Sequence, residues 1–363
     1  MSDQTATKPA LDFTPPRSGL AALQLRDAWH LLPWGIAIAF YFYADGFHSF
    51  GTNVLIMVLF TLSLDLALGY AGIITLGHAA FFGIGAYTAG VVAVHMTTDP
   101  IAGLILATIL AGILGVLTGM LILHTQGVAM FMLTLAIASM FYEVANQLRS
   151  VTGGDDGLTV PRSAPLLAYF GFAGFRFDFR GMTGYLYTLS VVFVWFVIAW
   201  RIVKSPFGRS LDGIRQNPRR MRAIGTPVWW RLVAMYGISA AMAGTAGGLQ
   251  AQATRLVGLT SLELQLSGIV AVMLVLGGER RLYGAFLGAV FFMAVQDWAA
   301  AVNPVYWMFV IGGLLMAVVL FLEGGLMGLL DKIFGMFAGK RVENAQPSSN
   351  EVKAGEVKTG DAK

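Results

Sequence analysis

Residues 201–231, RIVKSPFGRSLDGIRQNPRRMRAIGTPVWWR, form a strongly basic island in an otherwise apolar chain. The island holds eight Lys or Arg residues against a single acid, Asp212. Long hydrophobic runs flank it on both sides. Because basic loops between membrane spans stay in the cytoplasm, this loop is expected to fix the orientation of the protein in a membrane. It is also the expected docking point for a partner that drives the protein.

The composition of the whole chain is that of a membrane protein. Of its 363 residues, 56% are hydrophobic and 12% are charged, and the mean hydropathy is +0.70. Soluble domains carry about 25% charged residues. The 44 glycines point the same way, since small residues let transmembrane helices approach closely. The expected fold class is an all-α polytopic membrane protein.

Several function classes are excluded or disfavoured by what the sequence lacks. There is no cysteine, so disulfides and thiolate metal sites are excluded. Neither GxGxxG nor GxxxxGK[ST] occurs, so the chain cannot hydrolyse ATP through a P-loop. No metal-ligand spacing and no nucleophile–base arrangement is visible, so neither a metal site nor an enzyme is expected. The basic residues lie between spans, which disfavours nucleic acid as a partner.

Hydrophobic runs predict about ten transmembrane helices, each needing about 20 apolar residues. The runs lie at about 29–44, 52–70, 74–95, 101–123, 128–148, 184–202, 232–252, 262–277, 283–301 and 305–322. The eighth run is short, and Gly268 is expected to break it. The predicted domains are a disordered cytoplasmic tail at 1–28, a transmembrane domain at 29–338, and a second disordered cytoplasmic tail at 339–363.

Charge outside the spans predicts the orientation. No Lys or Arg occurs between Arg26 and Arg149, so the first five helices give no signal. If the loop 203–231 is cytoplasmic, the segment 149–182 lies outside. Both termini, together with Arg280 and Arg281, then lie inside. These independent segments agree on ten helices with both ends in the cytoplasm.

Glycine-rich junctions occur once in each half of the chain, at 69–85 and at 277–288. Such glycines permit close helix crossing or an unwound backbone that faces a cavity. Residues 72–77 are predicted to form a short re-entry or a tight turn. Packing alone is an equally good explanation of these glycines, and an internal repeat is left open.

Polar and small residues inside the spans are candidates for a translocation path. The candidates are Asn53, Asp65, Gly77, His78, Gly83, Gly85 and Gln250. A carboxylate within a span, such as that of Asp65, needs a partner or a proton. His78 could serve as a proton relay or contact a ligand, but a structural hydrogen bond is favoured. One Asp and one His make a thin case for an ion-coupled carrier.

The expected outer segment contains VTGGDDGLTVPR at 151–162. Its run of Gly and Asp is typical of a turn with positive φ angles, which glycine adopts at low cost. This turn could bind an external partner or gate the path, or it could be a simple surface turn. Its candidate residues are Gly153, Gly154, Asp155, Asp156 and Gly157.

The basic island has a pattern of its own. Apolar residues recur at helical spacing, Pro218 interrupts them, and Gly225 follows as a terminator. The pattern predicts two short amphipathic helices with a turn at Asn217 and Pro218. Two such helices would form a rigid projection to which a cytosolic partner could bind. The candidate coupling residues are Gly208, Arg209, Gly213, Ile214, Arg215, Asn217, Arg222 and Gly225.

A set of motifs carries a family resemblance. They are GYAG at 69–72, LGHAAFFGIGAY at 76–87, TGGDDGL at 152–158, SPFGR at 205–209, GIRQNPRRMRAIG at 213–225, LYGAFLGA at 282–289 and EGGLMGLL at 323–330. With these motifs in this order, the chain resembles the permease subunit of branched-chain amino-acid type ABC importers, the LivM family.

The resemblance implies a permease that moves a small polar solute inward across a bacterial inner membrane, with branched-chain amino acids as the leading candidate. It implies a second, LivH-like permease, two cytosolic ATPases and an external binding protein as partners. The chain itself would bind no cofactor, and ATP would be used by the ATPases. Residues 213–225 match the family's ATPase-coupling segment.

Two departures from the family pattern leave the substrate open. Glu279, Arg280 and Arg281 stand where relatives tend to carry a neutral turn, and Ile269 stands where relatives often carry an acid. Urea and short-chain amide permeases share most of the motifs. An ion-coupled carrier or a channel acting alone is the alternative from another class.

Overall fold

The computed structural model of this chain describes residues 32–43, 46–125, 127–161, 181–303, 309, 311–313, 316 and 325–328. The expected tails at 1–28 and 339–363, and most of the expected tenth helix, lie outside the described residues. Contacts divide the chain into a unit at 1–43 and a unit at 44–363. The described part of the first unit is one apolar helix, α2 (Leu32–Tyr43).

Within the described residues, seven helices are long and apolar enough to cross a membrane. They are α3 (His48–Leu64) with its continuation η2 (Asp65–Tyr70), α4 (His78–His95), α5 (Pro100–Ile122), α6 (Val128–Gln147), α8 (Met182–Lys204), α11 (Val228–Thr254) and α13 (Leu282–Val302). A shorter apolar helix is α12 (Leu264–Gly277). With α2, these match the first nine expected helices, and the all-α polytopic class is confirmed.

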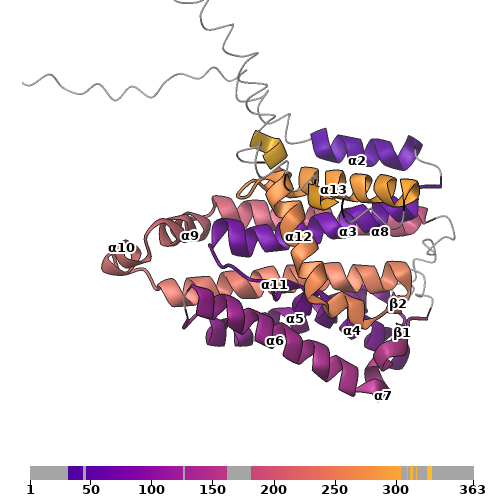
Figure 1. The fold of residues 1–363 in the computed structure, drawn as a ribbon, viewed down its shortest axis with the longest axis horizontal. Coiled ribbons are helices and arrows are strands. Elements are labelled where there is room, and N and C mark those ends of the chain that lie inside the picture. Colours follow the sequence, from indigo (N-terminus) through magenta and orange to yellow (C-terminus); the bar gives the residue numbers. More distant parts are fainter. Residues whose placement is uncertain are drawn as a thin grey trace, which may run out of the picture. The chain divides into compact units, whose positions relative to one another are not determined.

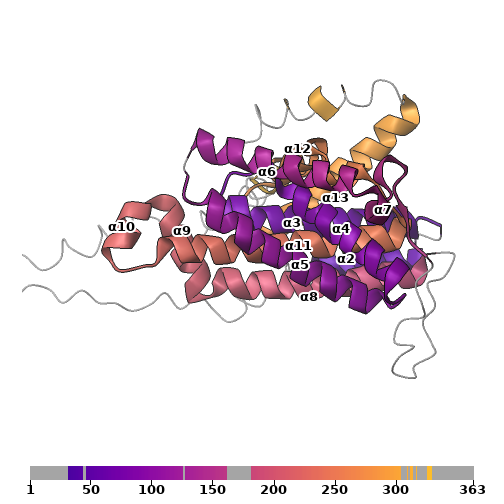
Figure 2. The same cartoon turned by 90° about the horizontal axis from the view of Figure 1, so that it is seen from below.

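Helix α11 forms the centre of the second unit, where it lies against α3, α4 and α5 (Figures 1 and 2). Glycines make these contacts close. A Cβ on Gly85 of α4 would overlap the backbone of Gly244 in α11, and a Cβ on Gly247 would overlap the carbonyl of Phe82. Since lipid tails are as apolar as leucine, tight packing of small residues supplies much of the attraction between membrane helices.

Two expected details of the helices are wrong. The third helix does not start near residue 74, because residues 71–77 form a turn and an extended segment and α4 begins only at His78. Helix α12 is not broken at Gly268 but continues through it. A single glycine costs a helix only about 1 kcal/mol relative to alanine, which neighbouring turns readily offset.

The loops fall into two sets at opposite ends of the bundle. At one end, β1 (Leu158–Thr159) pairs with β2 (Leu256–Val257) in an antiparallel ladder, beside α7 (Arg149–Thr152) and η3 (Gly154–Asp156). At the other end, α9 (Pro206–Gln216) and α10 (Pro218–Ala223) extend beyond α8 and α11 (Figures 1 and 2). This alternation of ends agrees with the order of spans expected from the sequence.

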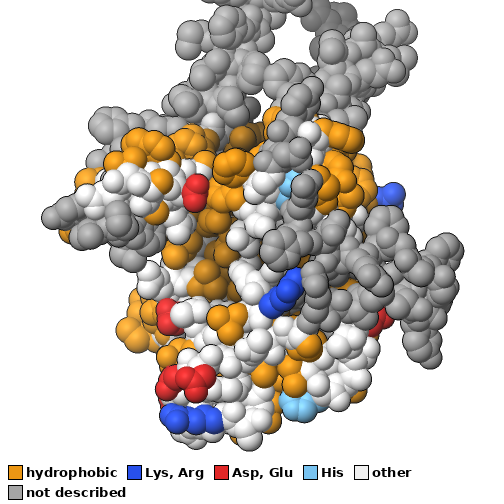
Figure 3. Space-filling view, turned by 90° about the vertical axis from the view of Figure 1, so that its right-hand side faces the viewer, with side chains coloured by type: hydrophobic (Ala, Val, Ile, Leu, Met, Phe, Trp, Pro, Cys, Tyr) orange, Lys and Arg blue, Asp and Glu red, His pale blue; other side chains and the backbone are white. Residues whose placement is uncertain are grey.

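The end that carries β1 and β2 is hollowed, and hydrophobic side chains line the hollow (Figure 3). The 3-10 turn η5 (Leu259–Leu262) leads from β2 into α12. Leu259 and Leu262 are buried there in a cluster with Val160 and Val257. The two halves of the chain therefore share one apolar core at this end.

Candidate functional site

The basic island folds into the two short helices that its sequence predicts. The side chain of Ser205 accepts a hydrogen bond from the N–H of Gly208 and caps α9. Asn217 caps α10 in the same way, through the N–H of Arg220 at 3.0 Å. Proline occupies the first position of each helix, where its missing N–H costs nothing. The expected turn at Asn217 and Pro218 is confirmed.

Gly225 ends α10, as expected. Its φ of +82° lies in the left-handed region, which glycine adopts without strain. The N–H of Gly225 bonds to the carbonyl of Arg222, and the N–H of Thr226 bonds to the carbonyl of Met221. These two bonds form a Schellman motif, which stops the helix and fixes the exit of the chain toward α11.

The α9–α10 hairpin buries one face and exposes the other. Leu211 and Ile214 are 0% and 2% exposed, whereas Ile224 is 74% exposed. The exposed face also carries arginines, so it is basic with an apolar tip. We define it as the docking surface, formed by Arg219, Arg220, Arg222 and Ile224.

Helix α3 changes to a π-helix at the end that lies next to this hairpin. Helix α3 widens into the π-helical turn η2, which begins at Asp65, and the chain then turns at Gly72 with a φ of +73°. Short π-helical stretches often mark functional sites. Asp65 is fully buried, and its Oδ1 accepts a hydrogen bond from the backbone N–H of Arg280 at 2.9 Å. The partner that the sequence required for this carboxylate is thus the loop between α12 and α13.

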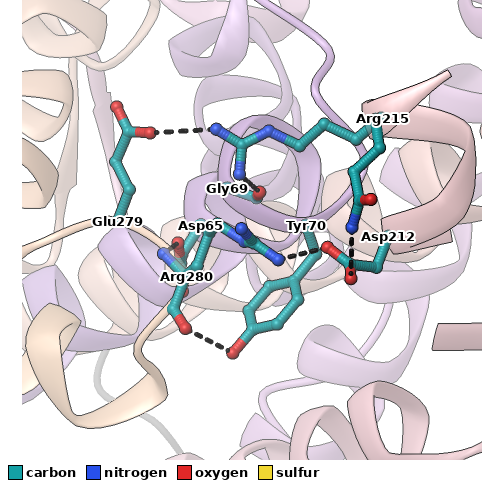
Figure 4. Close-up of polar contacts among 8 residues, drawn as sticks. Asp65, Gly69, Tyr70, Asp212, Arg215, Glu279 and Arg280 are labelled. Carbon is teal, nitrogen blue, oxygen red and sulfur yellow. Dashed lines mark hydrogen bonds and ion pairs between the residues drawn. The ribbon is translucent and has the colours of Figure 1, made fainter. Parts of the chain in front are cut away.

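Arg280 joins three elements through three different groups (Figure 4). Its N–H donates to Asp65, and its carbonyl accepts from the hydroxyl of Tyr70 at 2.9 Å. Its guanidinium forms an ion pair with Asp212 of α9. The φ of Arg280 is +64°, a left-handed conformation that is uncommon for a residue with a side chain. Arg280 therefore ties η2, the α12–α13 loop and α9 together.

Arg215 makes a second connection from α9. Its guanidinium donates to the carbonyl of Gly69 at 2.6 Å and lies 3.5 Å from the carboxylate of Glu279 (Figure 4). A Cβ on Gly72 would lie 3.0 Å from the Arg215 stem, and a Cβ on Gly69 would overlap the Asp65 carboxylate. The glycines of the first junction thus make room for the arginine and for the carboxylate.

These contacts form one group, which we call the junction network: Asp65, Gly69, Tyr70, Asp212, Arg215, Glu279 and Arg280. It brings the start of the first glycine-rich junction next to the second junction, more than 200 residues later in sequence, and joins both to the α9–α10 hairpin. Partly exposed ion pairs contribute only about 0–1 kcal/mol each to stability. The two ion pairs of the network, Arg215–Glu279 and Arg280–Asp212, therefore contribute little to the stability of the fold.

His78 lies in the closed core between α3, α4 and α11. It is 0% exposed, its Nε2 lies 2.9 Å from the hydroxyl of Ser63, and its ring stacks on Phe60. Ser239 of α11 donates to the carbonyl of Ser63 at 2.6 Å. His78 thus makes the hydrogen bond that the favoured interpretation requires, and its place in the path stays a prediction.

The remaining path candidates do not converge on one cavity. Asn53 and Gln250 are half-buried near the ends of α3 and α11 that face β1 and β2. Gly77, Gly83 and Gly85 lie where a Cβ would meet Thr134, Leu262 and Gly244 respectively, so all three permit close packing.

Two cavities of the described part involve other residues. One, of about 420 Å³, lies between α5, α8 and α11 and is almost entirely apolar. The other, of about 160 Å³, lies between α6 and the start of α12, and Ser139, Tyr142 and Glu263 contribute its polar groups. None of the seven path candidates lines either cavity.

The run of Gly and Asp forms the turn that its composition predicts. Gly153, Gly154 and Gly157 all have positive φ angles. A Cβ on Gly157 would lie 2.8 Å from the carbonyl of Val257 in β2. Asp155 and Asp156 are exposed, and Asp155 lies 3.8 Å from Arg149. The turn therefore supports the β1–β2 ladder and presents two carboxylates to solvent.

Sequence reasoning did not identify Tyr70, Glu279 and Arg280 as site residues. Glu279 and Arg280 stood out only as charges at an unexpected place, and nothing in the local sequence joined them to Asp65 or Asp212. Among the described residues, no group of three or more His, Asp or Glu side chains could hold a metal ion.

Comparison with known proteins identifies the family of the chain. The family model described as "Branched-chain amino acid transport system / permease component" matches residues 48–319, which include every element of the junction network. The chain belongs to this family. As a permease of a transport system, this multi-pass membrane protein is not an enzyme. No solved structure matches the chain.

Curated relatives of this permease carry names of the same kind. The high-affinity branched-chain amino acid transport system permease protein LivM of Salmonella typhimurium is 27% identical over 318 residues, covering 80% of this chain and 72% of its own. A probable LivM of Methanocaldococcus jannaschii is 25% identical, covering 65% of this chain and 76% of its own. An autoinducer 2 import permease, LsrC of Shigella flexneri, is 29% identical but covers only 40% of this chain and 44% of its own.

Proposed function

We propose that this chain is the membrane subunit of an ABC importer that moves branched-chain amino acids inward across a bacterial inner membrane. The observation that carries the proposal is the family match across residues 48–319. LivM relatives cover most of the chain, whereas the LsrC match covers less than half of it. This difference favours amino acids over other solutes.

The proposed partners are those that the family implies. One of two cytosolic ATPases would bind the docking surface, whose arginines and exposed Ile224 suit an acidic groove with an apolar floor. A second, LivH-like permease would complete the path, and an external binding protein would deliver the solute near the turn at 153–157. ATP is then hydrolysed by the partner subunits.

The orientation belongs to the same proposal. The hairpin at 203–231 would lie in the cytoplasm, and the segment 149–182 would lie outside. Both termini would be cytoplasmic. The residues proposed to receive the movement of the ATPases include Gly208 and Ile214, which are buried in the hairpin, Gly213, which is half-buried, and Arg209, which is exposed.

Uptake by the reconstituted complex tests the proposal. Leucine uptake that requires ATP and the external protein, and that excess leucine inhibits more strongly than urea or acetamide, is the expected result. Arg215→Glu and Gly225→Trp are expected to abolish uptake while leaving membrane insertion intact. Solute flux through this chain alone, driven by an ion gradient, would instead indicate an ion-coupled carrier.

A further inference from the structure

We propose that Arg280 is the positioning residue through which movement of the α9–α10 hairpin reaches both glycine-rich junctions. This inference rests on the proposed function and adds a mechanism to it. It concerns a residue outside the coupling segment, on a loop that sequence reasoning singled out only as a departure from the family pattern.

The first argument is that the backbone N–H, the carbonyl and the side chain of Arg280 are all bonded to other residues. Its backbone N–H, its carbonyl and its guanidinium are bonded to Asp65, Tyr70 and Asp212 respectively. Two of these partners lie on η2 and the third lies on α9. A displacement of α9 therefore acts on Arg280, and Arg280 acts on η2, the π-helical end of α3.

The second argument is that stability alone does not account for these contacts. Asp65 is 0% exposed, and its Oδ2 has no hydrogen-bond partner within the described residues. Burying a carboxylate is costly, and an ionisable residue inside a membrane protein usually serves a function. The left-handed backbone of Arg280 adds a further cost, because its side chain disfavours a φ of +64°. The hydrogen bond from the Arg280 N–H to Asp65 thus joins a strained backbone to a buried carboxylate.

The third argument is the position of the junctions beyond Arg280. After η2, the extended segment at 71–77 leads into α4. The first turn of α4 is bonded to α12, because the N–H of Ala79 donates to the hydroxyl of Ser267 at 2.8 Å. On the other side of Arg280, α13 begins at Leu282. A rotation of the loop at Arg280 would therefore shift the starts of both α4 and α13.

Arg215 makes a second set of contacts from α9, which holds the α9–α10 hairpin against η2 and the α12–α13 loop. Its bonds to Gly69 and Glu279 lie on the same two elements, but they reach a carbonyl and an exposed carboxylate, not a buried one. Arg215 thus positions α9, and Arg280 transmits its movement.

The experiment measures uptake and ATP hydrolysis by the full complex in proteoliposomes, so that transport per ATP can be calculated. Arg280→Gly removes the side chain but keeps a backbone that accepts a positive φ. We expect transport per ATP to fall by about two- to thirty-fold, with ATP hydrolysis retained. Arg255→Gly is the matched control, because Arg255 also has a positive φ, of +57°, is exposed, and lies outside both the basic island and the junction network. This control is expected to behave as wild type.

A double-mutant cycle separates transmission from loss of folding. If the contact between Arg280 and Asp212 carries the effect, Asp212→Ala combined with Arg280→Gly will be no worse than either single change. Additive losses, or an Arg280→Gly complex with wild-type transport per ATP, would overturn the inference. A wild-type complex that shows no ATP-driven uptake would overturn the proposed function itself, and with it this inference. Asp65→Asn, which keeps an acceptor for the Arg280 N–H, is expected to transport better than Asp65→Leu.

Discussion

Single glycines decide how closely the helices of this permease approach. Gly85 faces the backbone of Gly244, so there is no room for even one methyl group. Gly268, by contrast, has nothing within 4 Å of its expected Cβ position. The sequence alone could not separate these two glycines, since both stand inside apolar helices. Only their neighbours give them different roles.

The two glycines therefore predict opposite effects of the same substitution. Gly85→Ala is expected to destabilise the protein by about 1–3 kcal/mol, because α4 and α11 must move apart. Gly268→Ala is expected to stabilise α12 by up to about 1 kcal/mol, because alanine is the better helix former. Thermal unfolding of the purified protein in detergent measures both. Equal shifts in the same direction would contradict the packing role of Gly85.

At the scale of the element, the α9–α10 hairpin is the best-predicted part of the site. Its caps, its first-turn prolines and its terminal glycine are all local signals, so they can be identified without any tertiary contact. The same is true of the turn at 153–157, whose positive φ angles follow from its glycines. The π-helical end of α3, η2, has no comparable local sequence signal. The sequence indicated a turn at 72–77 but not the π-helical residues before it.

The cap of α10 gives a prediction for the whole element. Asn217→Ala is expected to weaken α10 by about 1 kcal/mol, because the N–H of Arg220 loses its acceptor. The docking surface would then lose its fixed orientation, so co-purification of the ATPase subunits and uptake should both decrease. Asn217→Ser retains a capping oxygen and should behave nearly as wild type. If the alanine variant matches the serine variant in both measurements, the hairpin does not depend on this cap.

At the scale of the whole molecule, successive spans run in opposite directions, so the loops between them lie in two sets at opposite ends of the bundle. The paired strands β1 and β2 hold one set together, and the junction network holds the other. From the charge distribution we expect the network to lie in the cytoplasm. Because the chain has no cysteine, any single introduced cysteine reports its own location without interference.

Labelling with a membrane-impermeant maleimide tests this orientation in intact cells. Asp156→Cys, in the exposed turn, is expected to react from outside without permeabilisation. Arg220→Cys, on the docking surface, is expected to react only after the membrane has been opened. The reverse pattern would mean that the basic island faces outward and that no cytosolic ATPase can bind it.

The sequence by itself determined the class of the protein, the order of its spans, the two-helix form of the basic island and its family. These properties depend on hydrophobic length, charge asymmetry, and local caps and turns, which are all read from residues close together in the chain. The tertiary structure alone decided which residues make the site. The bond from Asp65 to Arg280 spans more than 200 residues, and neither residue carries a local signal of the other. A buried carboxylate only requires some partner, and it is the packing of the two halves that supplies the partner and places it against α9.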